Sequence, residues 1–392
     1  MKKPSILFFL LPVAMVGCHS KPKQPLAELS SRDLFEKFRK NVVLIKSKSH
    51  YKVTFSNQKQ AWFSGFNDDE NVDLTFSEAE AIEQAETGYG TGFFISQKGL
   101  IATNFHVVCG GVNATIEKTD FKQAVITSLQ LMDEQARETA SMDVAKLKRY
   151  HPEDSLFIRD SVPGRYIDGT HEGSLAMDNY TSHETDSSSS ILKYHIDSLL
   201  AANSTIESLF QQDFKIEIVN DELSIQLDAS TKNSDVFPCH LYSLSQDKKI
   251  DLALIQTNDK MLPVGVGDVT DLLKENDDEH YGSTLQDNDT LKVTTPLYLI
   301  GYNYGPDIAK TAQGIKVQLG QGEVTQESDQ YRVLYSIPTL PGSSGSPVFN
   351  NKGKIVAINF SGYLIKENFN YGVLSSNLKD MVDKRPVLSV PL

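Results

Sequence analysis

Residues 341–348 read PGSSGSPV, a glycine- and serine-rich turn that runs into a short apolar strand. A serine hydroxyl becomes a good nucleophile only when a base accepts its proton and N–H donors stabilise the oxyanion. Gly342 frees the backbone to turn two N–H groups toward one point, and Gly345 permits a close backbone approach behind Ser344. Because turns of this composition also simply join strands, Ser344 is a candidate nucleophile that needs support from elsewhere in the chain.

Two further segments supply a base and an acid. TNFHVV (103–108) ends a predicted β-hairpin and contains His106, and IDLAL (250–254) opens a strand with Asp251. Each has an ordinary structural explanation when taken alone, since a histidine among apolar residues is more often a core residue and an acid often caps a turn. The order His106, Asp251, Ser344 is that of the chymotrypsin-type triad, whereas subtilisins and α/β-hydrolases have other orders.

Short β-rich segments surround these motifs and are separated by glycines and polar turns. Their spacing predicts closed antiparallel barrels. The segments are 41–46, 90–108, 223–228, 239–245, 251–256, 296–303, 315–324, 331–337, 354–360 and 369–376.

Residues 113–222 interrupt this β-rich series with helical periodicity. Apolar residues recur at helical spacing between Val125 and Leu147, and again between Leu192 and Leu200. We expect a helical hairpin close to the segment of His106, which either covers a rim of the cleft or packs away from it. The polar, acidic residues 55–87 are interpreted as a long surface loop.

Four segments carry a resemblance to a known family. They are GTGFFISQKGLIATNFHVV (90–108), VFPCHLYSLSQDKKIDLALIQ (236–256), PLYLIGYNYG (296–305) and PTLPGSSGSPVFNNKGKIVAINFSG (338–362). They resemble the trypsin-like (chymotrypsin-fold) serine endopeptidases, nearest to the bacterial HtrA-type envelope proteases. The resemblance implies an all-β fold of two antiparallel Greek-key β-barrels, here with a helical insertion in the first barrel.

The resemblance also implies roles for single residues. Ser344 would be the nucleophile, His106 the general base and Asp251 the residue that orients the imidazole. The backbone N–H groups of Gly342 and Ser344 would form the oxyanion hole. Ser343 stands where secreted digestive trypsins have an aspartate, so activation by a freed N-terminus is not expected. We also expect no PDZ domain, because few residues follow the motif of Ser344.

The substrate pocket that the resemblance implies contains no acidic residue. An unpaired ammonium in such a pocket would carry a large desolvation cost, so we expect cleavage after uncharged, small or medium apolar residues. The pocket residues are Pro338, Asn359, Phe360 and Ser361.

The N-terminus resembles a bacterial lipoprotein signal. Lys2 and Lys3 precede a short apolar stretch, residues 5–16, which ends at Gly17-Cys18. This pattern implies cleavage before Cys18 and lipid on its thiol, which would anchor the protein in the bacterial cell envelope. His19 favours the outer membrane, facing the periplasm. The alternatives are a secretory signal with an incidental cysteine and an uncleaved anchor.

Composition excludes several other classes of protein. The 392 residues are 40% apolar and 23% charged, which is typical of globular chains. The net charge of −13 argues against nucleic acid as a partner. Three cysteines are too few for a disulfide-stapled miniprotein and too scattered for a zinc site, and no motif indicates a metal or other cofactor. Cys109 and Cys239 are candidates for a disulfide, the alternative being two buried thiols.

These observations combine into one predicted organisation. A signal peptide (1–17) and a lipoprotein tether (18–30) precede a first barrel in two parts (31–112 and 223–260), which flank the mainly helical insertion (113–222). The second barrel (261–392) carries the nucleophile. The predicted function is a serine endopeptidase of the bacterial envelope that cleaves polypeptides through an acyl-enzyme. The alternatives are a catalytically silent, protease-fold binding module and an esterase, and no oligomeric state is predicted.

Overall fold

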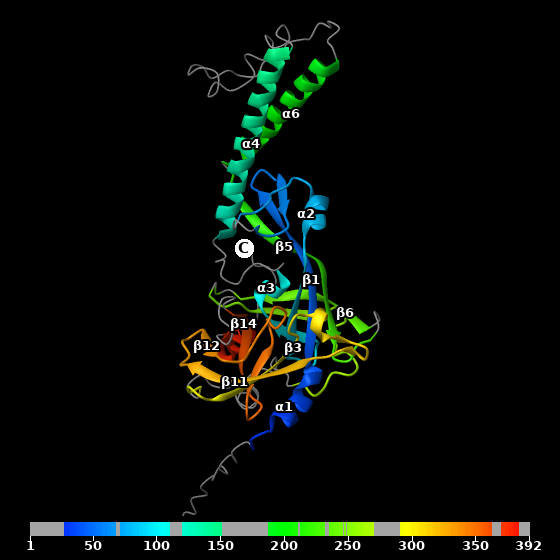
Figure 1. The fold of residues 1–392 in the computed structure, drawn as a ribbon, viewed down its shortest axis with the longest axis vertical. Coiled ribbons are helices and arrows are strands. Elements are labelled where there is room, and N and C mark those ends of the chain that lie inside the picture. The colour runs from blue at the N-terminus through cyan, green and yellow to red at the C-terminus, as the bar shows by residue number, and fades with distance from the viewer. Residues whose placement is uncertain are drawn as a thin grey trace, which may run out of the picture.

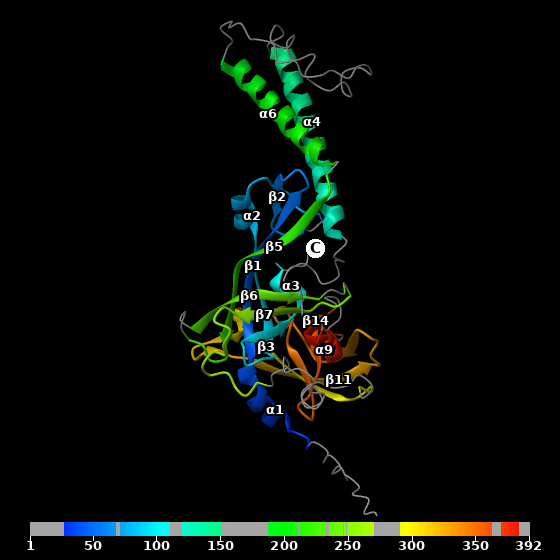
Figure 2. The same cartoon turned by 180° about the vertical axis from the view of Figure 1, so that it is seen from behind.

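Two closed six-stranded antiparallel barrels lie side by side, and a helical hairpin projects away from them (Figures 1 and 2). This computed structural model describes residues 27–67, 71–109, 120–150, 187–210, 212–231, 235–245, 247, 249–269, 291–362 and 370–383. The predicted signal peptide, Cys18 and most of the tether lie outside these residues. None of the described helices combines the length and the hydrophobicity needed to cross a membrane.

The first barrel closes because its last strand in the sheet order pairs back with its first. The order is β1-β3-β4-β7-β6-β5, and β5 pairs with β1. The strands are β1 (Val42–Phe55), β3 (Thr87–Phe94), β4 (Leu100–Thr103), β5 (Phe214–Leu227), β6 (Val236–Leu244) and β7 (Ala253–Thr257).

The second barrel is a closed ring in the order β11-β12-β15-β14-β13-β8. The pair of antiparallel barrels that the sequence predicted is therefore confirmed. The strands are β8 (Pro296–Gly301), β11 (Gln318–Gln326), β12 (Arg332–Tyr335), β13 (Pro347–Asn350), β14 (Ile355–Gly362) and β15 (Asn370–Leu374). Outside the ring lie β9 (Lys310–Thr311), β10 (Gly314–Ile315), α8 (Pro306–Ala309) and α9 (Ser375–Asp383).

Successive side chains of a strand point to opposite faces of the sheet. Some therefore face the interior of their own barrel, and their neighbours face the other barrel. Val43 and Ile45 of β1 belong to the interior cluster of the first barrel, whereas Leu44 packs in the cluster shared with the second barrel. On β8, Leu299 points into the second barrel and Ile300 into the shared cluster. The shared cluster also takes in Leu34 of α1 (Ser31–Phe38), a helix continued by the short helix η1 (Arg39–Asn41). The two barrels thus keep separate interiors and share one apolar cluster between them.

β1 and β5 continue beyond the barrel as a paired ribbon. They pair from Val43↔Leu227 to Phe55↔Phe214, with a change of register between Lys48 and Ser49. Past that irregularity β2 (Gln60–Phe63) replaces β3 as the second partner of β1. The result is a small sheet outside the barrel, which α2 (Glu78–Gln84) contacts. We call this outer sheet of β2, β1 and β5 the platform.

The platform corrects two predictions. Residues 55–87 are not one long surface loop, because they contain β2 and α2, and Phe63 and Val72 are buried in the platform core. The helical insertion does not reach residue 222, because β5 begins at Phe214. The first residues of β5 alternate between the buried Phe214 and Ile216 and exposed polar side chains, which is typical of a strand.

The predicted helical hairpin consists of α4 (Asp120–Tyr150) and α6 (Ser187–Phe210), which lie side by side (Figure 1). Its base packs on the platform through Phe121, Val125 and Leu129 of α4 and through Ile206 and Leu209 of α6. Farther out, a smaller cluster contains Val144, Leu147 and Ile196. The hairpin is thus rooted in the platform core and extends away from the barrels.

The two candidate disulfide residues are not bridged. Cys109 and Cys239 are both buried in the interior cluster of the first barrel, but no disulfide joins them. The Cys239 thiol lies 3.6 Å from the carbonyl oxygen of Phe237 on its own strand. The two cysteines thus lie in one barrel, as expected, and the structure has the alternative of two buried thiols instead of the candidate disulfide. The sequence left both alternatives open because it does not give the distance between the thiols.

We expect the Cys239 thiol to resist alkylation in the folded protein. Burial, followed by the charge of Asp259, raises its pKa to about 12. A raised pKa keeps the thiol protonated near neutral pH, and the thiolate is the reactive species. Iodoacetamide with peptide mass mapping should find Cys239 unmodified in the native protein, and both thiols modified after denaturation without reductant. Protection of both thiols in the denatured, unreduced protein would show a bond between them.

Candidate active site

His106 lies on a single helical turn that starts where β4 ends. This helix, α3 (Phe105–Val108), follows Asn104, whose backbone is extended. Phe105, Val107 and Val108 are buried in the first barrel and anchor the turn. His106 is left facing outward, with 17% of its side chain exposed.

Asp251 holds both the ring and the backbone of His106. Its Oδ2 lies 2.6 Å from His106 Nδ1, and its Oδ1 accepts the backbone N–H of His106 at 3.1 Å. The Asn104 side-chain amide donates to the backbone carbonyl of Asp251 at 2.7 Å. A carboxylate at Nδ1 favours the tautomer with the proton on that nitrogen, which leaves Nε2 able to accept a proton.

The turn of Ser344 docks against the strands that lead to His106. The Thr91 N–H on β3 donates to the Ser344 carbonyl at 2.7 Å, and the Thr91 hydroxyl donates to the Gly342 carbonyl at 2.9 Å. A Cβ on Gly345 would lie 1.9 Å from the Thr91 carbonyl oxygen and 2.4 Å from the Thr103 hydroxyl. Only glycine permits this approach, and Thr103 is the last residue of β4. The two barrels thus bring the predicted nucleophile to the strand end from which α3 starts.

The Ser344 hydroxyl has a different partner from the one the triad requires. Its Oγ donates to the carbonyl of Phe360 at 3.3 Å, and no hydrogen bond between the described atoms joins it to His106. Catalytic hydrogen bonds are often absent or long before substrate binds. Rotation about the Cα–Cβ bond of Ser344 would redirect the hydroxyl.

The peptide groups on either side of the turn are fixed through their carbonyl oxygens. The Pro341 carbonyl accepts the Tyr304 N–H at 2.5 Å, and the Ser343 carbonyl accepts the Ser346 N–H at 3.1 Å. In a planar trans peptide the N–H points opposite to the C=O. The N–H groups of Gly342 and Ser344 therefore point away from these partners, and neither donates to any other described residue. Within the described part of the chain, both donors of the predicted oxyanion hole are thus without an acceptor.

An uncharged network supports this turn from behind. The Asn359 amide donates to the Ser343 carbonyl at 3.1 Å and to the Ser343 hydroxyl at 3.2 Å. The Tyr335 hydroxyl donates to Asn359 Oδ1 at 2.6 Å. Burial raises the pKa of Tyr335 well above its usual value, so this hydroxyl stays a donor at any working pH. Ser343, which the resemblance aligns with an aspartate of secreted digestive trypsins, is part of this network.

The network corrects the predicted pocket. Asn359 is 1% exposed and its amide is engaged behind the turn, so its side chain cannot line a pocket for substrate. Pro338 is exposed and Phe360 is partly buried, with its ring centroid 6.2 Å from that of Tyr371. Ser361 lies on β14, but its side chain is outside the described part of the structure.

No sequence pattern indicated the roles of three side chains that hold the candidate active site in place. Thr91 lies in a glycine-punctuated strand, Asn104 precedes the histidine helix, and Asn359 follows an apolar run. Each donates to a backbone carbonyl of a residue more than a dozen positions away. Such partners meet only in the folded chain, so spacing along the sequence does not disclose them.

Part of the chain resembles a known protein family. Residues 210–358 match the family model described as a trypsin-like peptidase domain, a range that includes Asp251 and Ser344 but not His106. No curated protein matches the chain. A solved structure of the serine endoprotease from Yersinia pestis is similar at 11% sequence identity and a TM-score of 0.40, over 91% of this chain and 67% of that one. The double barrel and the match over residues 210–358 both fit the trypsin-like serine protease that the motifs predicted.

Proposed function

We propose that the chain is a serine endopeptidase in which His106, Asp251 and Ser344 act as the catalytic triad. The observation that carries the proposal is the contact of Asp251 with both the ring and the backbone of His106, at 2.6 and 3.1 Å. This arrangement fixes the tautomer and direction of the imidazole, which a general base requires. The available N–H groups of Gly342 and Ser344 supply the second requirement of acyl transfer.

The reaction follows from these positions. Ser344 Oγ attacks the scissile carbonyl carbon while His106 Nε2 takes the hydroxyl proton. The N–H groups of Gly342 and Ser344 stabilise the negative oxygen that forms, and His106 then gives its proton to the leaving amine. Water, activated by the same imidazole, hydrolyses the acyl-enzyme and restores Ser344. Each oxyanion donor is typically worth about 3 kcal/mol of activation free energy.

A fluorophosphonate probe tests the proposal directly, because it reacts only with an activated serine. We expect stoichiometric labelling of Ser344 and turnover of an unstructured polypeptide. A protein that hydrolyses simple esters but no peptide would instead be an esterase. Absence of both labelling and turnover would refute the proposal.

One observation favours the second candidate, a silent protease-fold module that binds envelope proteins. The Ser344 hydroxyl donates to Phe360 and not to His106. If this hydroxyl never leaves the Phe360 carbonyl, the serine is not activated. The fluorophosphonate probe separates the two candidates, because only a serine that reaches His106 will be labelled.

We expect cleavage after uncharged residues. None of Pro338, Phe360 and Ser361 is acidic, and Arg332 adds a positive charge 4.8 Å from the centre of the Tyr371 ring. A substrate Lys or Arg would therefore lack a counter-charge. Apolar pockets discriminate by only about 1–3 kcal/mol per methylene, so several small and medium residues should be accepted. A peptide library that varies the residue before the scissile bond measures this, and dominant cleavage after Lys or Arg would contradict it.

We further propose that the protein acts in the cell envelope as a lipoprotein. The proposal rests on the N-terminal sequence, with lipid on Cys18 and an outer-membrane location facing the periplasm. Cys18→Ser should move the protein from the membrane to the soluble fraction, whereas Cys109→Ser should leave it in the membrane. Fractionation and intact mass measure both, and an unlipidated, soluble mature wild type would contradict the proposal.

A further inference from the structure

The last carbonyl groups of the histidine helix are held by side chains from the β1–β5 ribbon. A helix of one turn has no intrahelical donors for these carbonyls, so outside donors fix its end. All the residues involved are buried or partly buried. The contacts are Ser47 Oγ to the Val107 carbonyl at 2.5 Å, Asn220 Nδ2 to the Val108 carbonyl at 2.9 Å, and the Tyr51 hydroxyl to the Cys109 carbonyl.

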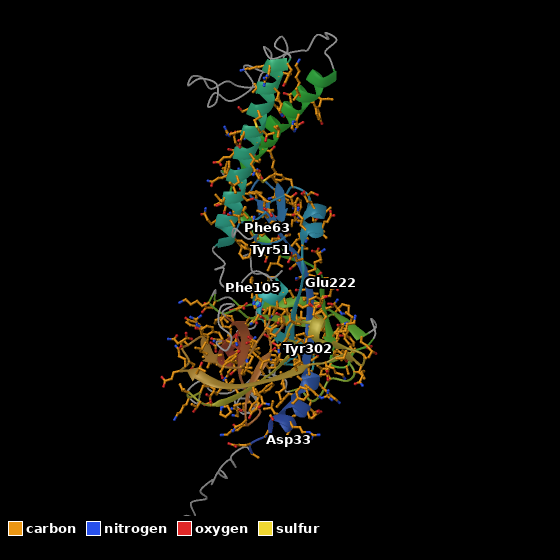
Figure 3. All side chains as sticks on the ribbon, in the orientation of Figure 1. Asp33, Tyr51, Phe63, Phe105, Glu222 and Tyr302 are labelled. Atoms are coloured by element: carbon orange, nitrogen blue, oxygen red, sulfur yellow. The ribbon has the colours of Figure 1, made fainter. Side chains whose placement is uncertain are left out.

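Tyr51 also contacts the helical hairpin. Its ring stacks on Phe63 of β2, with centroids 4.7 Å apart, and lies 5.1 Å from the ring of Phe121 in the first turn of α4. All three rings are at most 1% exposed. Figure 3 shows Tyr51 and Phe63 together in the platform, on the side of the barrels where Phe105 of α3 lies. One residue therefore joins the base of the hairpin to the end of α3.

We propose that Tyr51 is a positioning residue for His106, and that through it the base of the helical hairpin supports the catalytic histidine. This proposal rests on the proposed function. The ring of Tyr51 is fixed by Phe63 and Phe121, and its hydroxyl fixes the Cys109 carbonyl. A displacement of that carbonyl moves α3, and with it the 2.6 Å contact between His106 and Asp251. The insertion is then part of the framework of the active site and not an appendage.

The central variant is Tyr51→Phe, which removes the hydroxyl and keeps the ring. The matched control is Ser128→Ala on α4. It removes another buried hydroxyl of the platform core, one that donates to the Val72 carbonyl at 2.7 Å and does not contact α3. We expect kcat on a short peptide to fall about tenfold in Tyr51→Phe with KM little changed, because small misplacements of a catalytic group are costly. Ser128→Ala should keep the wild-type kcat.

A spectroscopic readout separates positioning from general stability. The proton shared by His106 Nδ1 and Asp251 should give a low-field NMR resonance in the wild type, assigned with His106→Gln. Below the unfolding transition of every variant, that resonance should shift or broaden in Tyr51→Phe and remain in place in Ser128→Ala. An unchanged resonance and kcat in Tyr51→Phe would overturn the proposal, as would equal losses in both variants.

Phe121→Leu tests the part played by the hairpin. It loosens the ring stack without touching the hydroxyl of Tyr51, and we expect a smaller loss of kcat in the same direction. A wild-type kcat and resonance in this variant would show that the hairpin does not support the histidine. If the wild type cleaves nothing, the proposed function fails, and the resonance alone then decides whether Tyr51 positions His106.

Discussion

Ser344→Ala should abolish peptide hydrolysis and all labelling by a serine-directed probe. In the proposed mechanism the oxygen of this hydroxyl forms the acyl bond, so no acyl-enzyme can form without it. Loss of the nucleophile in a triad typically lowers kcat roughly a millionfold. Ser208→Ala, which changes an exposed serine on α6, is the matched control and should keep full activity.

His106→Ala should cost almost as much as Ser344→Ala, and the double variant should cost little more. The three residues act as a unit, so their effects do not add. Progress curves on one peptide substrate, with the folded fraction measured for each variant, give the comparison. Full activity in purified Ser344→Ala, or additive losses in the double variant, would refute the triad.

The candidate catalytic residues could be selected from the sequence because each is marked by its neighbours in the chain. Ser344 is set between glycines that the turn requires, since both Gly342 and Gly345 have positive φ. His106 follows a hairpin, and Asp251 precedes a strand. Strand-forming segments at regular spacing were likewise sufficient to predict two barrels. Each of these features depends on residues that are neighbours in the chain, so it can be predicted from the sequence.

The residues that support the candidate site could not be predicted, because their partners are distant in the sequence. Asn359 was assigned to the pocket, but residues 355–359 are all buried, so alternation gives no sign of which way its side chain faces. The β1–β5 ribbon leaves the barrel at an irregularity in register after Lys48, which no turn residue marks. The platform, the early start of β5 at Phe214 and the contacts of Tyr51 all depend on that departure.

Asn359→Leu should lower kcat by about a hundredfold while KM changes little. Leucine matches the size of asparagine but cannot donate, so the Ser343 carbonyl loses its contact at 3.1 Å and keeps only the Ser346 N–H. The peptide that directs the Ser344 N–H is then less constrained. Loss of one oxyanion donor typically costs about 10²–10³ in kcat.

The same substitution should also lower stability, because it removes the 2.6 Å bond from the buried Tyr335 hydroxyl to Asn359 and leaves that hydroxyl only the Tyr371 carbonyl at 3.2 Å. A hydrogen bond between neutral groups typically contributes about 1 kcal/mol of folding free energy. Tyr335→Phe is the matched variant: it removes this hydroxyl but leaves both donors of the Asn359 amide on Ser343, so its loss of kcat should be much smaller. Kinetics and thermal unfolding of the two variants separate the effects. If Asn359→Leu lowers the melting temperature but retains kcat at a temperature where it is folded, Asn359 stabilises the barrel without holding the oxyanion turn. A loss of kcat confined to Asn359→Leu would mean that the neutral Asn359 amide holds this turn.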